Sequence, residues 1–218
     1  MNAENRRLLI EGSKSFGLSL KEKTVEDFDL YLRELLKWNQ KINLTAVRTE
    51  KEVVLKHFLD SLSTIPYLPE PASLLDIGSG AGFPGIPVKI VKPLLRTTLV
   101  DSVRKKVDFQ RHIIRTLGLK EIEAIHTRVQ DQDVPGPYRE HFDVVVSRAF
   151  SDLRKFLKLS YPLLRRGGIA LAMRGRWEGT ETRPEPEAGK PSYEPKGIHT
   201  FFLPFSQYER SLLLFEKR

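Results

Sequence analysis

The chain has 218 residues, of which 40% are hydrophobic and 29% are charged, a composition typical of a globular protein with a full hydrophobic core. It contains no cysteine, so disulfides and thiolate metal sites are excluded. No apolar run approaches the ~20 residues that span a membrane, and the first residues lack the apolar core of a signal peptide, so we expect a soluble cytoplasmic protein.

The net charge is +8, and the basic excess is confined to one part of the chain. Residues 1–71 contain 11 basic and 11 acidic side chains, whereas residues 72–218 contain 25 basic and 17 acidic ones. A basic region of this kind indicates a polyanionic partner, such as nucleic acid or an acidic membrane surface. Solubility alone is the alternative explanation of the charge.

The first part of the chain is predicted to be helical. Residues 4–16 form a first amphipathic segment. A second helix is expected to begin with Thr24 as its N-cap and to end near Asn39, because apolar residues recur there at helical spacing. Residues 38–45 mix polar and large apolar side chains and are predicted to form an irregular connection.

A third helix is predicted from a capping box. Thr49 and Glu52 have the spacing of this motif, in which each of the two side chains accepts a hydrogen bond from the backbone N–H of the other residue. His57 and Asp60 lie three residues apart on this helix and are spaced to touch. We expect a structural contact between them rather than a metal site, since no third ligand lies nearby.

The most informative segment runs from residue 74 to residue 85. Leu74–Ile77 is predicted as a buried strand, and helical periodicity resumes after Pro84. A strand, a glycine-rich turn and a helix open many nucleotide-binding α/β sheets, although a tight turn without a ligand gives the same pattern. No P-loop lysine follows, which argues against a phosphate-binding loop. The alternating glycines of the turn are Gly78, Gly80 and Gly82.

Two acidic residues favour the nucleotide-binding interpretation. Asp76 lies within the first strand, and the second predicted strand, Arg96–Val100, is followed by Asp101. An acid at the tip of the second strand is placed to accept hydrogen bonds from ribose hydroxyls. The motif Asp-x-Gly-x-Gly-x-Gly, with this acid about twenty residues later, resembles the S-adenosylmethionine (SAM) site of class I methyltransferases.

The remaining elements alternate between helices and strands. A helix through Val107 is predicted to stop at Gly118, and another is predicted at residues 153–164. Gly167 and Gly168 are predicted to form a turn, and residues 177–197, with four prolines, a surface loop. The other predicted strands are residues 122–126, 142–147 and 169–173, with a final strand pair at 200–203 and 211–215.

This order of elements predicts an α/β fold, and the resemblance of the glycine motif implies that the fold is of the class I SAM-dependent methyltransferase type. We expect a Rossmann-like, doubly wound sheet that is mostly parallel and ends in an antiparallel C-terminal hairpin. Residues 1–71 are predicted as an N-terminal helical extension and residues 72–218 as the methyltransferase domain.

Several segments together make the chain similar to one family. The glycine motif continues as Gly-Phe-Pro-Gly-Ile-Pro, and Ser-Arg-Ala-Phe occupies residues 147–150. With these segments the chain resembles the bacterial small-subunit ribosomal RNA guanine-N7 methyltransferases (GidB, also called RsmG). The other matching segments are Lys37–Asn39, Asn43–Thr45 with Val47–Arg48, His57–Ser61, Leu99–Ser102 with Lys105–Val107, Arg174–Gly175, and Glu209–Arg210 near the end of the chain.

The resemblance implies a SAM-dependent enzyme that acts on small-subunit rRNA. It implies a monomer whose substrate is N7 of one guanine in 16S rRNA (position 527 in the usual numbering of that RNA). It also implies a SAM pocket that includes Gly78, Phe83, Val129, Gln130 and Arg148. In one departure from the family pattern, Arg174 stands where lysine is expected, and a planar guanidinium is not equivalent to an ammonium.

The residues of the predicted cofactor site have distinct roles. The glycines would admit the methionine part and ribose of SAM, Asp76 would bind its ammonium and Asp101 the ribose hydroxyls. Arg148, at the end of the fourth predicted strand, is expected to point into the crevice at the carboxyl ends of the strands, where ligands bind in such sheets, and a surface salt bridge is the alternative. The predicted cofactor-binding residues are Asp76, Gly78, Gly80, Gly82, Phe83, Asp101, Val129, Gln130 and Arg148.

Basic residues around the second and fifth predicted strands are candidates for phosphate contacts with RNA. They are Arg104, Lys105, Lys106, Arg111, Arg165, Arg166, Arg174 and Arg176. We assign no catalytic base, because guanine N7 carries a lone pair and no proton, and we expect no metal site. The alternatives are a methyltransferase that acts on a protein or small molecule, and a non-catalytic RNA-binding module.

Overall fold

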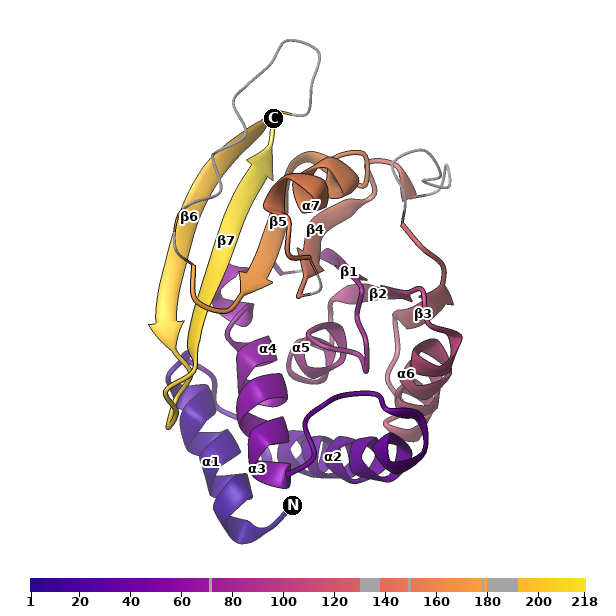
Figure 1. Cartoon of the computed structure of the whole chain (residues 1–218), viewed down its shortest axis with the longest axis vertical. Helices are drawn as coiled ribbons and strands as arrows, with labels where there is room; N and C mark the ends of the chain where they lie inside the picture. The colour runs from indigo at the N-terminus through magenta and orange to yellow at the C-terminus, as the bar shows by residue number, and fades with distance from the viewer. Residues whose placement is uncertain (71, 130–137, 149, 178, 180–191) are drawn as a thin grey trace.

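The computed structural model describes residues 1–70, 72–129, 138–148, 150–177, 179 and 192–218. Its centre is a seven-stranded sheet with the strand order β3-β2-β1-β4-β5-β7-β6 (Figure 1). The strands are β1 (Ser73–Ile77), β2 (Arg96–Asp101), β3 (Ile122–His126), β4 (Phe142–Ser147), β5 (Leu164–Arg174), β6 (Tyr193–Phe202) and β7 (Glu209–Lys217).

Five of the strands, β1 to β5, run parallel to one another, so their carboxyl ends lie at the same edge of the sheet. β1 pairs in parallel with β2 and β4, β2 with β3, and β4 with β5. β7 runs antiparallel to both β5 and β6. The carboxyl ends of β1 to β5 therefore meet at one edge, called here the carboxyl edge, which is where ligands bind in such sheets. The predicted fold class is confirmed.

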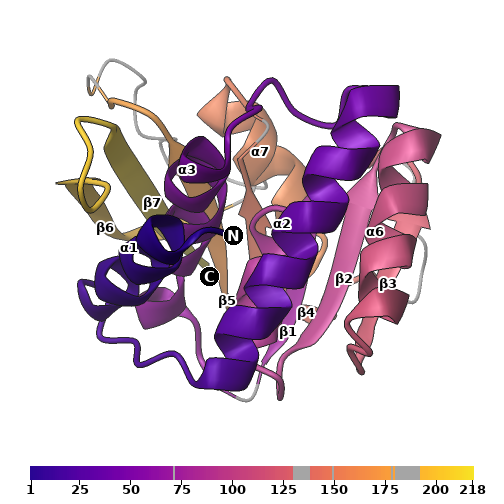
Figure 2. The same cartoon turned by 90° about the horizontal axis from the view of Figure 1, so that it is seen from below.

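Helices cover the two faces of the sheet unequally. One buried cluster joins α1, α2, η1, α5 and α6 to one face, and a second joins α7 to the other face. Figure 2 shows α2 and α6 side by side in front of the strands, with α7 behind them. The helices are α1 (Ala3–Lys14), α2 (Glu22–Ile42), α3 (Glu50–Val53), the π-helix η1 (Val54–Leu59), α4 (Asp60–Leu62), the 3₁₀-helix η2 (Ile65–Tyr67), α5 (Gly85–Val91), α6 (Arg104–Thr116) and α7 (Leu153–Ser160).

The N-terminal helices share their core with the sheet. Leu9, Phe28 and Phe58 are fully buried in the same cluster as Leu74 and Leu99 of the first two strands. Burial of this apolar surface is the main force that holds the extension against the sheet. The division of the chain into an extension of residues 1–71 and a methyltransferase domain of residues 72–218 stays a prediction.

The limits of α2 differ from the prediction at both ends. The helix begins at Glu22, after Lys21, and Thr24 is not its N-cap. It continues to Ile42 and ends where Asn43 adopts a left-handed conformation with φ of 49°. Asn39 lies in its last turns, where its side chain accepts a hydrogen bond from the backbone N–H of Thr45 at 2.9 Å. The polar residues that suggested a loop therefore hold the following loop against the helix.

The predicted capping box marks the start of the third helix, but the Glu52 side chain accepts from the Thr49 hydroxyl at 3.1 Å rather than from the Thr49 backbone N–H. Thr49 is the N-cap of α3, and its Oγ1 accepts from the backbone N–H of Glu52 at 3.3 Å. The helix then widens into the π-helix η1, a feature that the apolar spacing did not reveal.

The predicted turn before the fifth strand was wrong. Gly167 and Gly168 lie inside β5, where the pairing with β4 shifts between Phe142 and Val144. Gly167 has a φ of 77°. The two glycines therefore form a bulge within the strand and not a turn that precedes it. α7 accordingly ends at Ser160, earlier than predicted.

The C-terminal hairpin is longer than predicted. β6 begins at Tyr193, within the segment predicted as a surface loop. The Tyr193 hydroxyl donates to the carbonyl oxygen of Leu157 at 3.0 Å and contacts Ser160 Oγ at 2.9 Å, which anchors this strand to α7. Within the predicted loop, residues 178 and 180–191 lie outside the described residues.

Candidate cofactor and substrate site

The glycine turn is fastened to the tip of β2. The backbone N–H of Gly78 donates to the carbonyl oxygen of Val100 at 2.8 Å, and that of Gly80 donates to Asp101 Oδ2 at 2.8 Å. Gly82 has a φ of 98°, and a Cβ there would lie 2.8 Å from the Tyr31 hydroxyl. The positive φ and this close approach explain why glycine is needed in the turn.

Asp101 is held in place by the backbone but keeps free acceptor capacity. Its Oδ1 accepts from the N–H of Val103 at 2.8 Å, and its Oδ2 accepts from Gly80. Each carboxylate oxygen has two lone pairs, so both can accept a second hydrogen bond. The residue is only 6% exposed and lines a cavity, so its orientation is fixed before any ligand binds.

A cavity of about 800 Å³ opens at the carboxyl edge beside Asp101. Three of the predicted cofactor-binding residues line this cavity, namely Gly78, Asp101 and Val129. Phe150 and Lys106 form other parts of its wall. Gly80 contacts Asp101 through its backbone, whereas the predicted residue Gln130 lies outside the described residues. The structure thus brings together the residues that end β1, β2 and β3.

Asp76 lies beneath the glycine turn and not in the cavity wall. Its Oδ2 accepts from the N–H of Gly85 at 2.8 Å, while its Oδ1 is buried without a hydrogen-bond partner. Burial raises the pKa of Asp76 to about 7, although the hydrogen bond from Gly85 and the charge of Arg148 act in the opposite direction. The observed contact of Asp76 ties β1 to the start of α5.

Phe83 belongs to an aromatic stack that links the extension to the turn. Its ring is stacked on His57 at 4.4 Å and on Tyr31 at 5.4 Å between centroids, and the residue is 5% exposed. The Tyr31 hydroxyl donates to the carbonyl oxygen of Ala81 in the turn. Phe83 is therefore placed in the core next to the turn, away from the wall of the cavity.

The predicted contact between His57 and Asp60 was wrong. His57 Nε2 contacts Thr45 Oγ1 at 2.8 Å, and Nδ1 lies 3.1 Å from the carbonyl oxygen of Lys56, so both ring nitrogens are occupied elsewhere. Burial, followed by the charge of Arg148, lowers the pKa of His57 to about 3. His57 is therefore neutral at physiological pH.

Asp60 instead joins two arginines that are far apart in the sequence, one directly after β4 and one in β7. Its Oδ2 lies 3.0 Å from Nη2 of Arg148, and its Oδ1 accepts from Nε of Arg210 at 3.0 Å. Asp60 is 2% exposed, whereas the two arginine side chains are 22% and 20% exposed. Arg148 Nη2 also donates to the carbonyl oxygen of Lys56 at 3.0 Å. Asp60 thus fixes both guanidinium groups at the carboxyl edge.

A second cavity of about 460 Å³ lies between these arginines. Arg148, Arg210 and Arg174 line it together with Asp60. Arg174 donates to the carbonyl oxygen of Ser151, and its guanidinium lies 5.1 Å from the ring centre of Trp177. Three guanidinium groups against one carboxylate make this cavity attractive to anions.

The two cavities adjoin, because Phe150 lines both of them. Arg148 was predicted to bind the cofactor, but it lines the second cavity rather than the first. The places of Asp60 and Arg210 in the wall of the second cavity were not predicted from the sequence. The family-like segments at His57–Ser61 and Glu209–Arg210 were the available signal.

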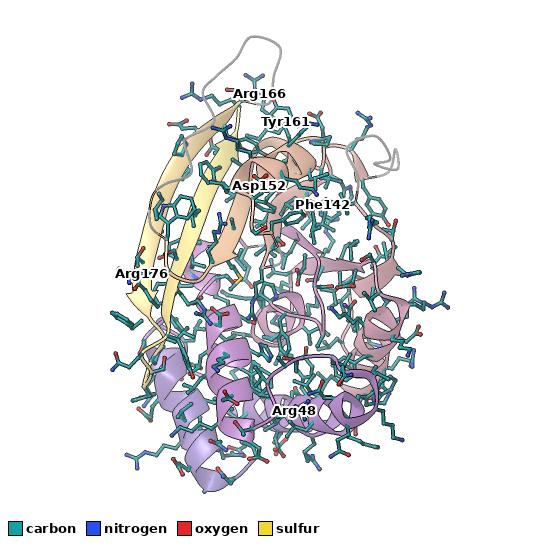
Figure 3. The ribbon with its side chains drawn as sticks, viewed as in Figure 1. Arg48, Phe142, Asp152, Tyr161, Arg166 and Arg176 are labelled. Carbon is teal, nitrogen blue, oxygen red and sulfur yellow. The ribbon has the colours of Figure 1, made fainter. Side chains whose placement is uncertain are left out.

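The predicted RNA-binding residues do not form one face. Arg104, Lys105 and Lys106 begin α6 at the carboxyl edge, the same edge as Arg174. Arg165 and Arg166 lie at the start of β5, and Figure 3 shows Arg166 and Arg176 far apart along the sheet. Several candidates have partners within the protein. Arg165 pairs with Asp143, Arg111 donates to the carbonyl oxygen of Ala124 at 3.0 Å, and Arg104 and Arg176 pair with Asp108 and Glu209 at 3.3 and 3.9 Å.

Among the residues that the structure describes, no three His, Cys, Asp or Glu side chains are grouped so that they could hold a metal ion. In the same residues, no helix is both long and apolar enough to cross a membrane.

Comparison with solved structures supports the fold. The chain is similar to Pyrococcus horikoshii TYW2, solved in complex with MeSAdo, with a TM-score of 0.57 and 13% identity over 74% of this chain and 62% of that one. It is also similar to a SAM-dependent methyltransferase from Aquifex aeolicus, with a TM-score of 0.54 and 18% identity over 75% of this chain and 93% of that one.

Comparison of sequences identifies the family. Residues 24–211 match the family model described as GidB, rRNA small subunit methyltransferase G. The proteins named ribosomal RNA small subunit methyltransferase G from Geobacter metallireducens and Acetivibrio thermocellus are 43% and 41% identical to the chain. These matches cover 100% and 97% of this chain and 99% and 88% of the relatives. The chain therefore belongs to the rRNA small subunit methyltransferase G family, as its sequence motifs predicted.

Proposed function

We propose that this protein transfers a methyl group from SAM to N7 of a guanine in 16S rRNA of the small ribosomal subunit. Membership of the family supplies the reaction class and the type of RNA. The observation that carries the proposal is the pair of adjoining cavities, one beside Asp101 and one lined by three arginines, with Phe150 between them.

The residues of the first cavity fit SAM. Its volume falls within the roughly 300–1,000 Å³ that is usual for small-molecule sites. Asp101 would accept hydrogen bonds from the ribose hydroxyls, and the backbone near Val129 would face the adenine. The turn at Gly78 and Gly80 leaves room for close approach of the ligand. When bound, SAM supplies an electrophilic methyl group on a sulfonium centre.

The arginines of the second cavity fit the RNA. Arg148 and Arg210 are fixed by Asp60, so little side-chain entropy is lost when they bind an anion. Guanidinium groups match phosphate oxygens and also donate to acceptor atoms on the edge of guanine. We assign the target nucleotide to this cavity, with N7 directed past Phe150 toward the first one.

The chemistry requires alignment and not proton transfer. N7 attacks with an in-plane lone pair and carries no proton to be removed. His57 is neutral with both ring nitrogens occupied, and Asp76 lies beneath the turn. The protein therefore accelerates the reaction by holding the two reactants in line and excluding water.

Two measurements test this function. SAM binding by calorimetry separates an enzyme from a binding module that only keeps the fold. Incubation with methyl-labelled SAM and unmethylated small subunits or rRNA should place the label in 16S rRNA. A label found in ribosomal protein, or no transfer despite SAM binding, would refute the proposal. We further propose that the protein is a cytoplasmic monomer. Light scattering of the purified protein measures its molecular mass and so tests the monomeric state.

A further inference from the structure

The turn between β6 and β7 exposes three aromatic side chains. We call residues 202–208 the hairpin tip. Phe202, Phe205 and Tyr208 are 60%, 64% and 37% exposed, and they are three of the six large hydrophobic side chains exposed in the described residues. Scattered exposed apolar side chains are ordinary, but aromatic residues gathered within one turn mark an interaction site.

The hairpin tip is a fixed structure. Leu203 is 1% exposed and anchors the tip in the protein, and its backbone N–H donates to the carbonyl oxygen of Tyr208 at 2.9 Å. Ser206 Oγ donates to the carbonyl oxygen of Leu203 at 2.9 Å and accepts from the N–H of Tyr208 at 3.2 Å. Aromatic rings on a preformed turn lose little entropy when they bind.

Phe205 adopts an unusual backbone conformation. Its φ of 58° lies in the left-handed region, which is unfavourable for a bulky residue. Such strain of the backbone collects at functional positions. Here the turn holds an exposed phenylalanine where glycine or asparagine would fit more easily.

The hairpin tip is connected to the arginine-lined cavity. Lys56 Nζ lies 4.5 Å from the ring centre of Tyr208, and the carbonyl oxygen of Lys56 accepts from Arg148. Arg210, two residues after Tyr208, lines the same cavity. In Figure 1 the β6–β7 turn extends past the end of β5. An RNA strand whose target base occupies this cavity would therefore run past the hairpin tip, and the nucleotides next to the target would lie beside the tip.

We propose that the hairpin tip binds single-stranded rRNA next to the target guanine by stacking its aromatic rings on the neighbouring bases. The inference rests on the proposed function and extends it to a second contact. Aromatic rings beside cationic side chains are the usual combination for binding unpaired nucleotides, since every base has a π-face and every phosphate a negative charge. The cations here are Lys56, Arg148, Arg174, Arg176 and Arg210, against the acids Glu52, Asp60 and Glu209, of which Glu52 pairs with Lys56 at 2.7 Å.

The test compares RNA affinity in three variants. Phe202→Ala and Phe205→Ala each remove an exposed ring, and Phe205→Trp keeps a stacking surface. Leu94→Ala is the matched control, because Leu94 is 68% exposed and lies just before β2, at the other edge of the sheet. The dissociation constant is measured for protein-free 16S rRNA over a range of salt concentrations, with SAM affinity and circular dichroism as checks on the fold.

Each alanine variant should weaken RNA binding by roughly 5- to 150-fold, the range expected for loss of one stacked base. The slope of affinity against salt should stay at the wild-type value, because no phosphate contact is lost. Phe205→Trp and Leu94→Ala should bind RNA like the wild type.

Three outcomes would overturn the inference. Unchanged RNA affinity in both alanine variants would remove the stacking role, while wild-type methylation of RNA would leave the proposed function intact. A loss seen with assembled small subunits but not with protein-free rRNA would show that the tip contacts a ribosomal protein. Equal weakening by Leu94→Ala would show a non-specific effect of exposed apolar surface.

Discussion

Replacing Asp101 with alanine should weaken SAM binding more than it weakens the fold. In the proposed site this carboxylate is the acceptor for the ribose hydroxyls of SAM, and hydrogen bonds to a charged group contribute roughly 1.5–3 kcal/mol. Loss of this acceptor predicts a decrease in SAM affinity of about 10- to 150-fold.

The same substitution also removes two contacts within the protein. The N–H groups of Gly80 and Val103 lose the carboxylate that accepts from them at 2.8 Å. Val103 is 44% exposed, so water can replace part of this bonding. We therefore expect the free energy of unfolding to fall by only about 1–2 kcal/mol.

Calorimetry with SAM and urea denaturation measure the two effects of Asp101→Ala. Asp108→Ala is the matched control, since Asp108 is an acid on α6 whose contact with Arg104, at 3.3 Å, lies on the surface. Wild-type SAM affinity in Asp101→Ala, with a normal circular dichroism spectrum, would refute the assignment. Equal losses of affinity in both variants would do the same.

Three further predictions concern the charged residues around the site. Lys105→Glu should weaken RNA binding and reduce its salt slope by about 1 or more, with little effect on SAM; an unchanged slope would misplace the RNA contact. Asp60→Asn should lower the free energy of unfolding by about 2–3 kcal/mol in urea titrations, less than a fully buried pair, because Arg148 and Arg210 keep contact with water; a loss under 1 kcal/mol would contradict this. Single-turnover methyl transfer should be flat from about pH 6.5 upward in both wild type and His57→Gln, since N7 has no proton to lose and the transfer uses no protein base; a steep acid limb that His57→Gln abolishes would contradict this mechanism.

His57 also predicts a pH dependence of stability. Its folded-state pKa of about 3 is lower than the usual value of 6.5, so below pH 6.5 the unfolded chain takes up a proton that the native protein does not. The contribution of neutral His57 to stability is complete above pH 6.5 and is lost as the pH falls toward 3. The free energy of unfolding of His57→Gln should therefore decline less steeply over this range than that of the wild type.

The parts of the site that were predicted from sequence depend on local patterns. The turn at Gly78 and the acid at Asp101 follow apolar strands directly, so their places at the carboxyl edge follow from a parallel sheet. The capping box at Thr49 was predictable for the same reason, because both partners lie within one helical turn.

The parts that were missed depend on contacts between distant segments. Asp60 and Arg210 are 150 residues apart, and no periodicity in the sequence pairs them. Phe83 lies next to a cofactor motif, but two rings from the N-terminal helices draw it into the core. Likewise, Arg165 lies at the start of β5, at the edge opposite the carboxyl edge. The sequence did not predict this position, because β5 begins before the bulge and not after it.

Locating the methyl group on the RNA tests the proposed reaction most directly. Small subunits that lack the modification are incubated with the protein and SAM, and the 16S rRNA is then treated with borohydride and aniline, which cleave at N7-methylguanine. One new cleavage site that appears with wild-type protein, and is strongly reduced with Asp101→Ala at limiting SAM, is the predicted result. Incorporation of the methyl group into 16S rRNA without such a cleavage would show that another atom is methylated and would contradict the account.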